Sequence, residues 1–223
     1  MPRSPSQRVS IAGFSLVELL VAISVVAILA TLILPVLGKA KSQSHQAVCI
    51  SNLRRIGNAF SLYVHDAGAY PTTYGQWYPR LFPYLDIDSS KDISVTRPTV
   101  LRCPANKEHQ WNSQKLSYGY NSFLGNNNSS ATNPISLRPM SFSRPSQVIL
   151  CGDVDNRLKA PNAIVNYNRT TGSPPGVTHN GRANLLYVDG HVEPKKPEEV
   201  TSQAGKYTTP ILKMWGMYGY YAD

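Results

Sequence analysis

Apolar residues fill an almost unbroken run near the start of the chain, from Phe14 to Leu37. These 24 residues contain one ionisable side chain, Glu18. At about 1.5 Å per residue they predict a helix of about 36 Å, long enough to cross a bilayer core of about 30 Å. A carboxylate inside such a helix is costly, so Glu18 is expected to have a functional role.

After Gly38 the chain becomes polar but keeps one apolar stripe at helical spacing. The stripe consists of Cys49, Leu53, Ile56, Phe60 and Tyr63, at steps of four, three, four and three. Gly68 and Pro71 then form a stop signal. The pattern predicts one helix of about 50 residues whose second half packs on a globular head. Pro35 should cause a bend or local melting within it.

Beyond Tyr70, frequent prolines and polar loops predict turns and short strands. The strands expected are Gln147–Cys151, Ala183–Val188, His191–Glu193 and Thr209–Met214. Asp189-Gly190 separates the second from the third and predicts a two-residue hairpin turn, with Val188 opposite His191 and the ladder ending at Pro194. The predicted fold class is α+β: a long N-terminal helix packed on a small antiparallel sheet.

The residues before the apolar run are short and basic, with Arg3 and Arg8, and they end in Gly13. A secretory signal is cleaved after its apolar region, not before it. The segment GFSLVE, from Gly13 to Glu18, resembles the processing site of type IV prepilins. The resemblance implies cleavage after Gly13 and N-methylation at Phe14 by a prepilin peptidase. It also implies assembly roles for Glu18 and for Pro35, the counterpart of the family's helix-bending proline.

This resemblance divides the chain into four parts: a leader over 1–13, an assembly and membrane helix over 14–37, the soluble half of the helix over 38–68, and a β-rich head over 69–223. Cleavage would create an amine at Phe14, which can pair with Glu18 of a neighbouring subunit. Such a pair is shielded from water, and losing one partner leaves the other unpaired. A plain single-pass anchor is the alternative, but it leaves the Gly13 junction unexplained.

A second resemblance lies near the C-terminus. His179, nine intervening residues and Asp189-Gly190 resemble the H-X9-DG signature of a large bacterial pseudopilin-like group. One interpretation makes His179 and Asp189 metal or catalytic partners. In the other, which we favour, Asp189 serves the turn and His179 forms a hydrogen bond across the adjoining strand or loop.

Metal binding is a separate hypothesis. Related pseudopilins with a sheet-bearing head often hold calcium, which prefers oxygen ligands. Asp153 and Asp155, joined by Asp189, are the candidate Ca²⁺ ligands, and an exposed turn after the preceding strand is the alternative. Zinc is less favoured than calcium, because Cys103, Cys151, His109 and His179 show no close paired spacing. No cofactor is required by the sequence.

Three cysteines allow one disulfide and leave one thiol. Three pairings are open, and the sequence does not choose between them. Cys103–Cys151 is slightly favoured because it would tie two parts of the head together. In that interpretation Cys49 is simply a buried member of the helix stripe.

The net charge is +9, with the positive residues scattered singly, which favours a solvated surface over a nucleic-acid interface. No nucleophile elbow, P-loop or H-E-x-x-H motif occurs, so no enzyme is predicted. Four aromatic residues lie close together near residue 218, namely Trp215, Tyr218, Tyr220 and Tyr221. They either complete the core of the head or form a binding surface.

Together these features predict a pseudopilin: a structural subunit of a type II secretion or type IV pilus-like filament. Its expected partners are the prepilin peptidase, other pseudopilin subunits, an inner-membrane assembly platform and lipid. We expect it in a bacterial inner membrane, with a cytoplasmic N-terminus and a periplasmic head, before extraction into a filament. The alternative is a surface adhesin or DNA-uptake minor pilin whose basic, aromatic head binds an anionic polymer or a glycan.

Overall fold

The computed structural model describes residues 15–71, 77–88, 99–106, 116–121, 124, 142–154, 164–165 and 175–200. The chain forms two compact units, Met1–Lys41 and Ser42–Asp223, which are described separately. The elements in chain order are α1 (Leu16–Ala67), η1 (Tyr78–Leu81), α2 (Phe82–Leu85), β1 (Tyr118–Asn121), η3 (Pro145–Gln147), β2 (Ile149–Asp153), β3 (Ile164–Val165), β4 (Ala183–Tyr187), β5 (Val192–Lys195) and α3 (Pro197–Val200).

The first unit contains the apolar half of α1. Every large apolar side chain from Leu16 to Leu37 is 50–77% exposed. Among the described residues, α1 is the one helix whose length and composition would let it cross a membrane. This apolar surface therefore has no cover from the rest of the described chain.

The second unit contains the other half of α1, which buries one face. The buried residues on this face are Cys49, Asn52, Leu53, Ile56, Gly57, Ala59, Phe60 and Val64. The helix ends where Gly68 adopts a φ of 75°, and its N–H donates to the carbonyl of Val64 at 2.8 Å. A glycine in the left-handed region is a common C-terminal cap, so the sequence stop signal works as expected.

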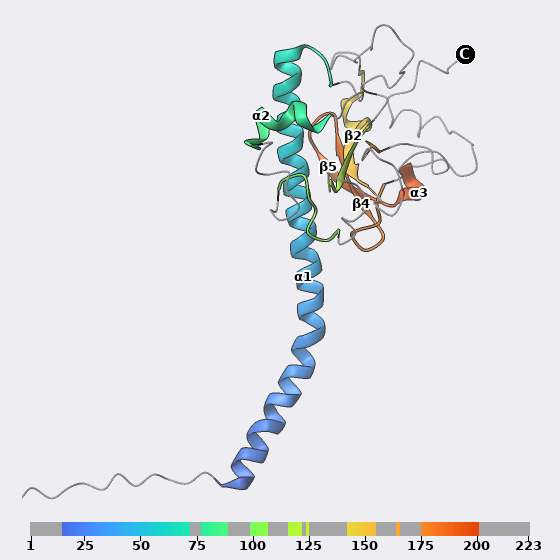
Figure 1. Ribbon diagram of the computed structural model, residues 1–223. Coiled ribbons are helices and arrows are strands. Elements are labelled where there is room, and N and C mark those ends of the chain that lie inside the picture. The colour runs from blue at the N-terminus through green and yellow to red at the C-terminus, as the bar shows by residue number, and fades with distance from the viewer. Residues whose placement is uncertain are drawn as a thin grey trace, which may run out of the picture. The chain divides into compact units, whose positions relative to one another are not determined.

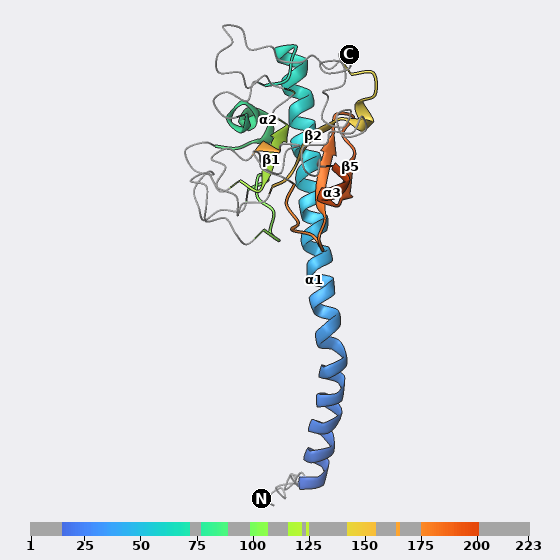
Figure 2. The same cartoon turned by 90° about the vertical axis from the view of Figure 1, so that its right-hand side faces the viewer.

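The head is built around a five-stranded sheet in the order β3-β1-β2-β4-β5. Strands β1, β2, β4 and β5 pair antiparallel, and the two-residue β3 joins β1 in parallel. Figures 1 and 2 show the second half of α1 running along this sheet. Four of the five strands thus form the antiparallel sheet that the sequence predicts.

Aromatic stacking joins α1 to the sheet. The ring of Phe60 stacks on Trp77 at 5.5 Å and on Tyr120 of β1 at 5.1 Å between ring centroids. One turn away, a Cβ on Gly57 would lie 3.1 Å from Leu186 Cδ1 of β4, so glycine permits a close approach of helix and sheet. The main core of the head lies between these two layers.

The predicted fold class is confirmed, and the strands at 149–153, 183–187 and 192–195 lie close to their expected positions. Strands β1 and β3 were not predicted, and the expected strand at 209–214 lies outside the described residues. The β4–β5 ladder does not end at Pro194 but continues to Lys195. Proline has no N–H to donate, and in a central strand this would break the hydrogen-bond ladder. β5 is an edge strand with a neighbour on one side only, so it can contain Pro194.

Candidate functional site

The first candidate site is the start of α1. The Ser15 N–H donates to Glu18 Oε2 at 2.9 Å, and the Val17 N–H donates to Ser15 Oγ at 3.2 Å. These reciprocal bonds make a capping box, a Ser-x-x-Glu arrangement that satisfies amides at a helix start. The Ser-x-x-Glu spacing from Ser15 to Glu18 is readable in the sequence, although no capping box was predicted from it. The Glu18 carboxylate is therefore held beside the amide that directly follows Phe14.

Two predicted residues of this site, Gly13 and Phe14, lie outside the described residues. Pro35 lies inside α1, which continues through it without interruption. Of the two predicted effects, a bend or local melting, the structure therefore excludes local melting. Proline lacks an N–H and removes one hydrogen bond of the helix ladder. Beyond Pro35 the apolar run continues only through Val36 and Leu37, before Gly38 and Lys39.

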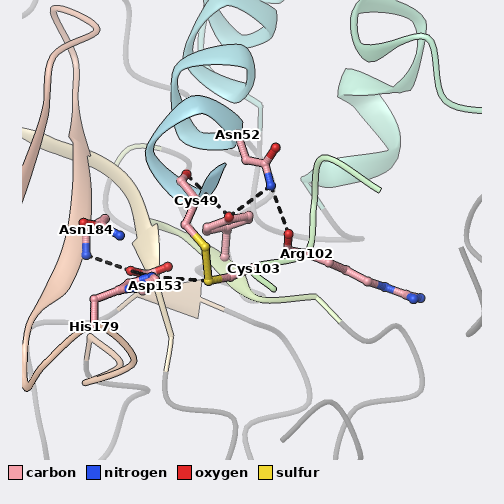
Figure 3. A network of polar contacts seen from close by, with 8 residues as sticks. Cys49, Asn52, Arg102, Cys103, Asp153, His179 and Asn184 are labelled. Carbon is pink, nitrogen blue, oxygen red and sulfur yellow. Dashed lines mark hydrogen bonds and ion pairs between the residues drawn. A yellow bond between two sulfur atoms is a disulfide. The ribbon is translucent and has the colours of Figure 1, made fainter. Parts of the chain in front are cut away.

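The second candidate site is a buried polar network in the head (Figure 3). A disulfide joins Cys49 of α1 to Cys103, with the two Cα atoms 5.2 Å apart. The predicted Cys103–Cys151 pairing is wrong, because Cys151 is a free, buried thiol on β2. Burial raises the pKa of that thiol well above its ordinary value.

A hydrogen bond near Cys49 explains the observed pairing. Asn52 Nδ2, less than one turn beyond Cys49, donates to the carbonyl of Arg102 at 3.0 Å. This bond holds the 99–106 segment against α1 and brings Cys103 to Cys49. Cys49–Cys103 is one of the three pairings that the sequence left open, but the place of Cys49 on the apolar stripe favoured a simply buried thiol.

His179 and Asp153 complete the network. His179 Nε2 lies 3.3 Å from Cys103 Sγ and 3.6 Å from Asp153 Oδ2. The other contact of Asp153 Oδ2 is the backbone N–H of Asn184, which donates to it at 2.7 Å. Both side chains are almost fully buried. The cluster thus gathers two sulfurs, an imidazole and a carboxyl from four separate segments.

Burial sets the protonation of this pair. It raises the pKa of Asp153 to about 7, and the hydrogen bond from Asn184 offsets only part of that rise. Burial also lowers the pKa of His179, with a smaller contribution from His45 nearby. Both shifts disfavour the charged forms, so His179 is neutral near pH 7 and the contact is weaker than an ion pair between full charges.

A tight turn positions His179. Its N–H donates to the carbonyl of Arg182 at 3.1 Å, and the Arg182 N–H donates back at 3.0 Å. Asn180 and Gly181 between them both have positive φ, 52° and 76°. Asn-Gly is the preferred pair for such a two-residue hairpin turn. Asn180-Gly181 is readable in the sequence as a hairpin turn, although no turn was predicted there.

The Asp189-Gly190 turn differs from its prediction. Only Gly190 has a positive φ, 91°, and the loop holds three residues because the Tyr187 N–H donates to the carbonyl of His191. Asp189 Oδ1 contacts His191 Nδ1 at 2.6 Å and accepts its backbone N–H at 3.2 Å. A two-residue turn of the predicted kind needs two residues with positive φ, whereas a three-residue loop needs only one. The longer loop places Tyr187, and not Val188, opposite His191.

The H-X9-DG signature therefore brackets β4. His179 precedes the strand and Asp189 follows it, so about 16 Å of strand separates their turns. The two are not partners, which contradicts the metal or catalytic interpretation of the pair. It agrees with the favoured one, in which Asp189 serves its turn.

The same separation bears on the calcium hypothesis. Asp153 contacts the start of β4 through Asn184, whereas Asp189 lies beyond its end, so they do not share a site. Asp155 lies outside the described residues, as do the aromatic residues around Trp215. Asp153 is enclosed next to His179 and does not lie in an exposed loop.

Comparisons with known proteins bear on the first site. Residues 8–34 match a family model described as the prokaryotic N-terminal methylation motif. The chain is pilin-like. It is also distantly similar to type II secretion system core protein G of Aeromonas hydrophila, with 38% identity over 61 residues, 27% of this chain and 43% of the relative. The chain thus matches less than half the length of that curated relative, and no solved structure matches it.

The methylation motif includes Gly13, Phe14 and Glu18 and implies processing by a prepilin peptidase. Pilin-like proteins are typically structural and not enzymatic. Their N-terminal apolar helix is consistent with an inner membrane or pilus location. The capping box at Ser15 and Glu18 lies within the matched residues, whereas the buried network of the head lies outside them.

Proposed function

We propose that this pilin-like chain is a pseudopilin, a structural subunit that is cleaved after Gly13, methylated at Phe14 and assembled into a type II secretion or type IV pilus-like filament. The observation that carries the proposal is the apolar half of α1, which is exposed on all sides and lies largely within residues 8–34, the match to the methylation motif. Full burial of a large apolar side chain contributes about 1.5–3 kcal/mol. This surface therefore needs lipid first and neighbouring helices afterwards.

Glu18 gives the assembly its register in this proposal. Its carboxylate lies beside the Ser15 amide, one residue from the amine that cleavage would create at Phe14. In a stacked filament the same carboxylate can meet the Phe14 amine of a neighbouring subunit. A buried carboxylate without a partner is strongly destabilising, so subunits that place the two charges together are favoured.

The chain's location follows from the same features. The apolar helix would hold the precursor in the inner membrane, with the leader in the cytoplasm and the head in the periplasm. The Cys49–Cys103 disulfide supports this orientation, because disulfides persist in oxidising compartments. Extraction from lipid requires energy from a separate cytoplasmic ATPase and contacts with an inner-membrane assembly platform.

An adhesin or DNA-uptake minor pilin is the second candidate function. Arg54 and Arg55 are adjacent and exposed on α1, and the chain carries a net charge of +9. These charges would attract an anionic polymer. In this case Arg54→Ala/Arg55→Ala would lose polymer binding and leave filaments intact, whereas a purely structural subunit would show no such loss.

The deciding experiment is mass spectrometry of the N-terminal peptide, from membranes of cells with and without the prepilin peptidase. We expect a chain that starts at N-methylated Phe14 only when the peptidase is present. Glu18→Gln should be cleaved but excluded from filaments. Ser24→Ala is the matched control, because the Ser24 hydroxyl only donates to the carbonyl of Val21. A chain that keeps Met1–Gly13 in the presence of the peptidase would overturn the proposal.

A further inference from the structure

The buried network contains a set of metal-binding atoms that no sequence motif reveals. Cys49 Sγ, Cys103 Sγ and a ring nitrogen of His179 lie within 4.8 Å of one another, the one such group of three or more among the described residues. All three side chains are buried. Asp153 Oδ2 lies outside this group of three but only 3.6 Å from His179 Nε2, which makes it the candidate for a fourth donor (Figure 3).

The spacings around His179 are close to those of a tetrahedral zinc centre, whereas the two sulfurs are bonded to each other and must separate when the disulfide is reduced. Bonds of about 2.3 Å to sulfur and about 2.05 Å to nitrogen or oxygen place neighbouring ligands about 3.6 Å apart for N and S, and about 3.4 Å apart for N and O. The observed separations are 3.3 Å from Cys103 Sγ to His179 Nε2, and 3.6 Å from there to Asp153 Oδ2. The imidazole and carboxyl are thus already near their positions.

The Asp153 carboxyl group also has an oxygen that could still accept a hydrogen bond or bind a cation. Asp153 Oδ1 is buried and accepts no hydrogen bond among the described residues. A buried carboxylate oxygen without a partner is costly, and a cation bound at this group would compensate for it. Thiolates and imidazole select zinc over calcium or magnesium, which prefer oxygen ligands.

We propose that Cys49, Cys103, His179 and Asp153 bind a zinc ion in the dithiol form of the chain, before the disulfide forms. Each thiol releases one proton and its thiolate bonds to the metal. Oxidation of the two thiolates by an external disulfide forms the Cys49–Cys103 bond, removes both sulfur ligands and releases the zinc. The external disulfide leaves as two thiolates, which take their protons from solvent. Metal and disulfide therefore exclude each other at one site.

The site would act during maturation of the head. Its donors come from α1, the 99–106 segment, β2 and the turn before β4, the same segments that the disulfide and its hydrogen bonds hold together. Zinc would keep these segments assembled until oxidation makes the connection covalent. This inference is independent of the proposed filament function.

The test uses the full chain in detergent, reduced with a phosphine under anaerobic conditions and titrated with Co²⁺. We expect tetrahedral ligand-field absorption, thiolate-to-cobalt charge transfer, one metal per chain and displacement by Zn²⁺. The oxidised chain should show none of these. His179→Gln and Asp153→Asn should each weaken binding by about tenfold or more, since even supporting residues around a metal matter that much.

Two matched controls make the result specific. Cys151→Ser removes the buried free thiol, and His191→Gln removes a histidine of the distant hairpin turn, so both should bind cobalt like the unmodified chain. Circular dichroism of each oxidised variant shows whether the head is folded. If reduction unfolds the head, cobalt will bind thiols without regard to His179. Wild-type affinity in His179→Gln, lost binding in Cys151→Ser, or no thiolate charge transfer would each overturn the proposal.

Discussion

The two halves of α1 belong to one continuous helix but meet opposite environments. From Leu16 to Leu37 the helix is apolar around its whole circumference, and its large side chains stay at least half exposed. From Cys49 to Val64 it is amphipathic, with one face buried against the head. The second half finds its partner in its own chain, whereas the first half has no partner among the described residues.

This difference separates two sources of stability. The soluble half depends on contacts that can be named, such as the stacking of Phe60 on Trp77 and Tyr120. The apolar half depends on a medium, lipid or neighbouring helices, in which every side can be buried. Substitutions in one half should therefore leave the properties of the other unchanged, and this independence can be tested directly.

The largest expected effect is in the soluble half. Phe60→Ala removes a fully buried ring and should lower the free energy of unfolding of the head by about 3–5 kcal/mol. Leu62→Ala is the matched control, because Leu62 lies two residues away and is 53% exposed. It should change stability by no more than about 0.5 kcal/mol.

Urea unfolding of the full chain in detergent, followed by far-UV circular dichroism, measures both variants. Equal losses for Phe60→Ala and Leu62→Ala would show that this part of α1 has no distinct buried face. Membrane association of Phe60→Ala should remain unchanged, since the substitution lies outside the apolar half.

The sequence predicted the features of α1 because they are local and periodic. Steps of three and four in the stripe at 49–63 and the cap at Gly68 follow from helix geometry alone. The β4–β5 hairpin was recognised for the same reason, although its register depended on whether Asp189-Gly190 forms a two- or three-residue loop. A local sequence pattern thus predicts that a hairpin forms, whereas its register also depends on contacts with the rest of the sheet.

The head network could not be predicted because its members are distant in the sequence. The disulfide joins cysteines 54 residues apart, and Cys103 meets His179 across 76 residues. Spacing rules for zinc sites assume ligands that lie close together in pairs, so they exclude this cluster. The Asn180-Gly181 turn that positions His179 was readable from the sequence, but its role depends on what the fold brings to it.

The next prediction concerns the apolar half. Val26→Arg places a charge near the middle of the apolar run and should cost about 2.5–3.5 kcal/mol of membrane insertion. Val26→Leu is the neutral control. Carbonate extraction of membranes measures the inserted fraction, and urea unfolding in detergent measures the head. Unchanged insertion of Val26→Arg would contradict a membrane-spanning role, and a less stable head would contradict the independence of the two halves.

The smallest expected effect is a loss of head stability at high pH, where tyrosines ionise. All the tyrosines of the described residues lie outside the apolar half, so this change acts on the head alone. Burial raises the pKa of Tyr70 to about 12, so the folded head keeps a proton that the unfolded chain loses near pH 10. Stability is complete below pH 10 and falls as pH rises toward 12. At pH 11 the loss from Tyr70 is about 1.4 kcal/mol.

Tyr70→Phe keeps the ring that faces Phe60 and Phe142 but removes the ionisable hydroxyl. The other buried tyrosines titrate alike in both chains, so the difference between the chains isolates Tyr70. Unfolding curves at pH 9 and pH 11 should show the variant losing about 1.4 kcal/mol less than the wild type. Equal losses would mean that Tyr70 ionises as freely in the folded head as in water. Tyr70 would then not be buried against Phe60, and the end of the soluble half of α1 would be more exposed to water than the structure shows.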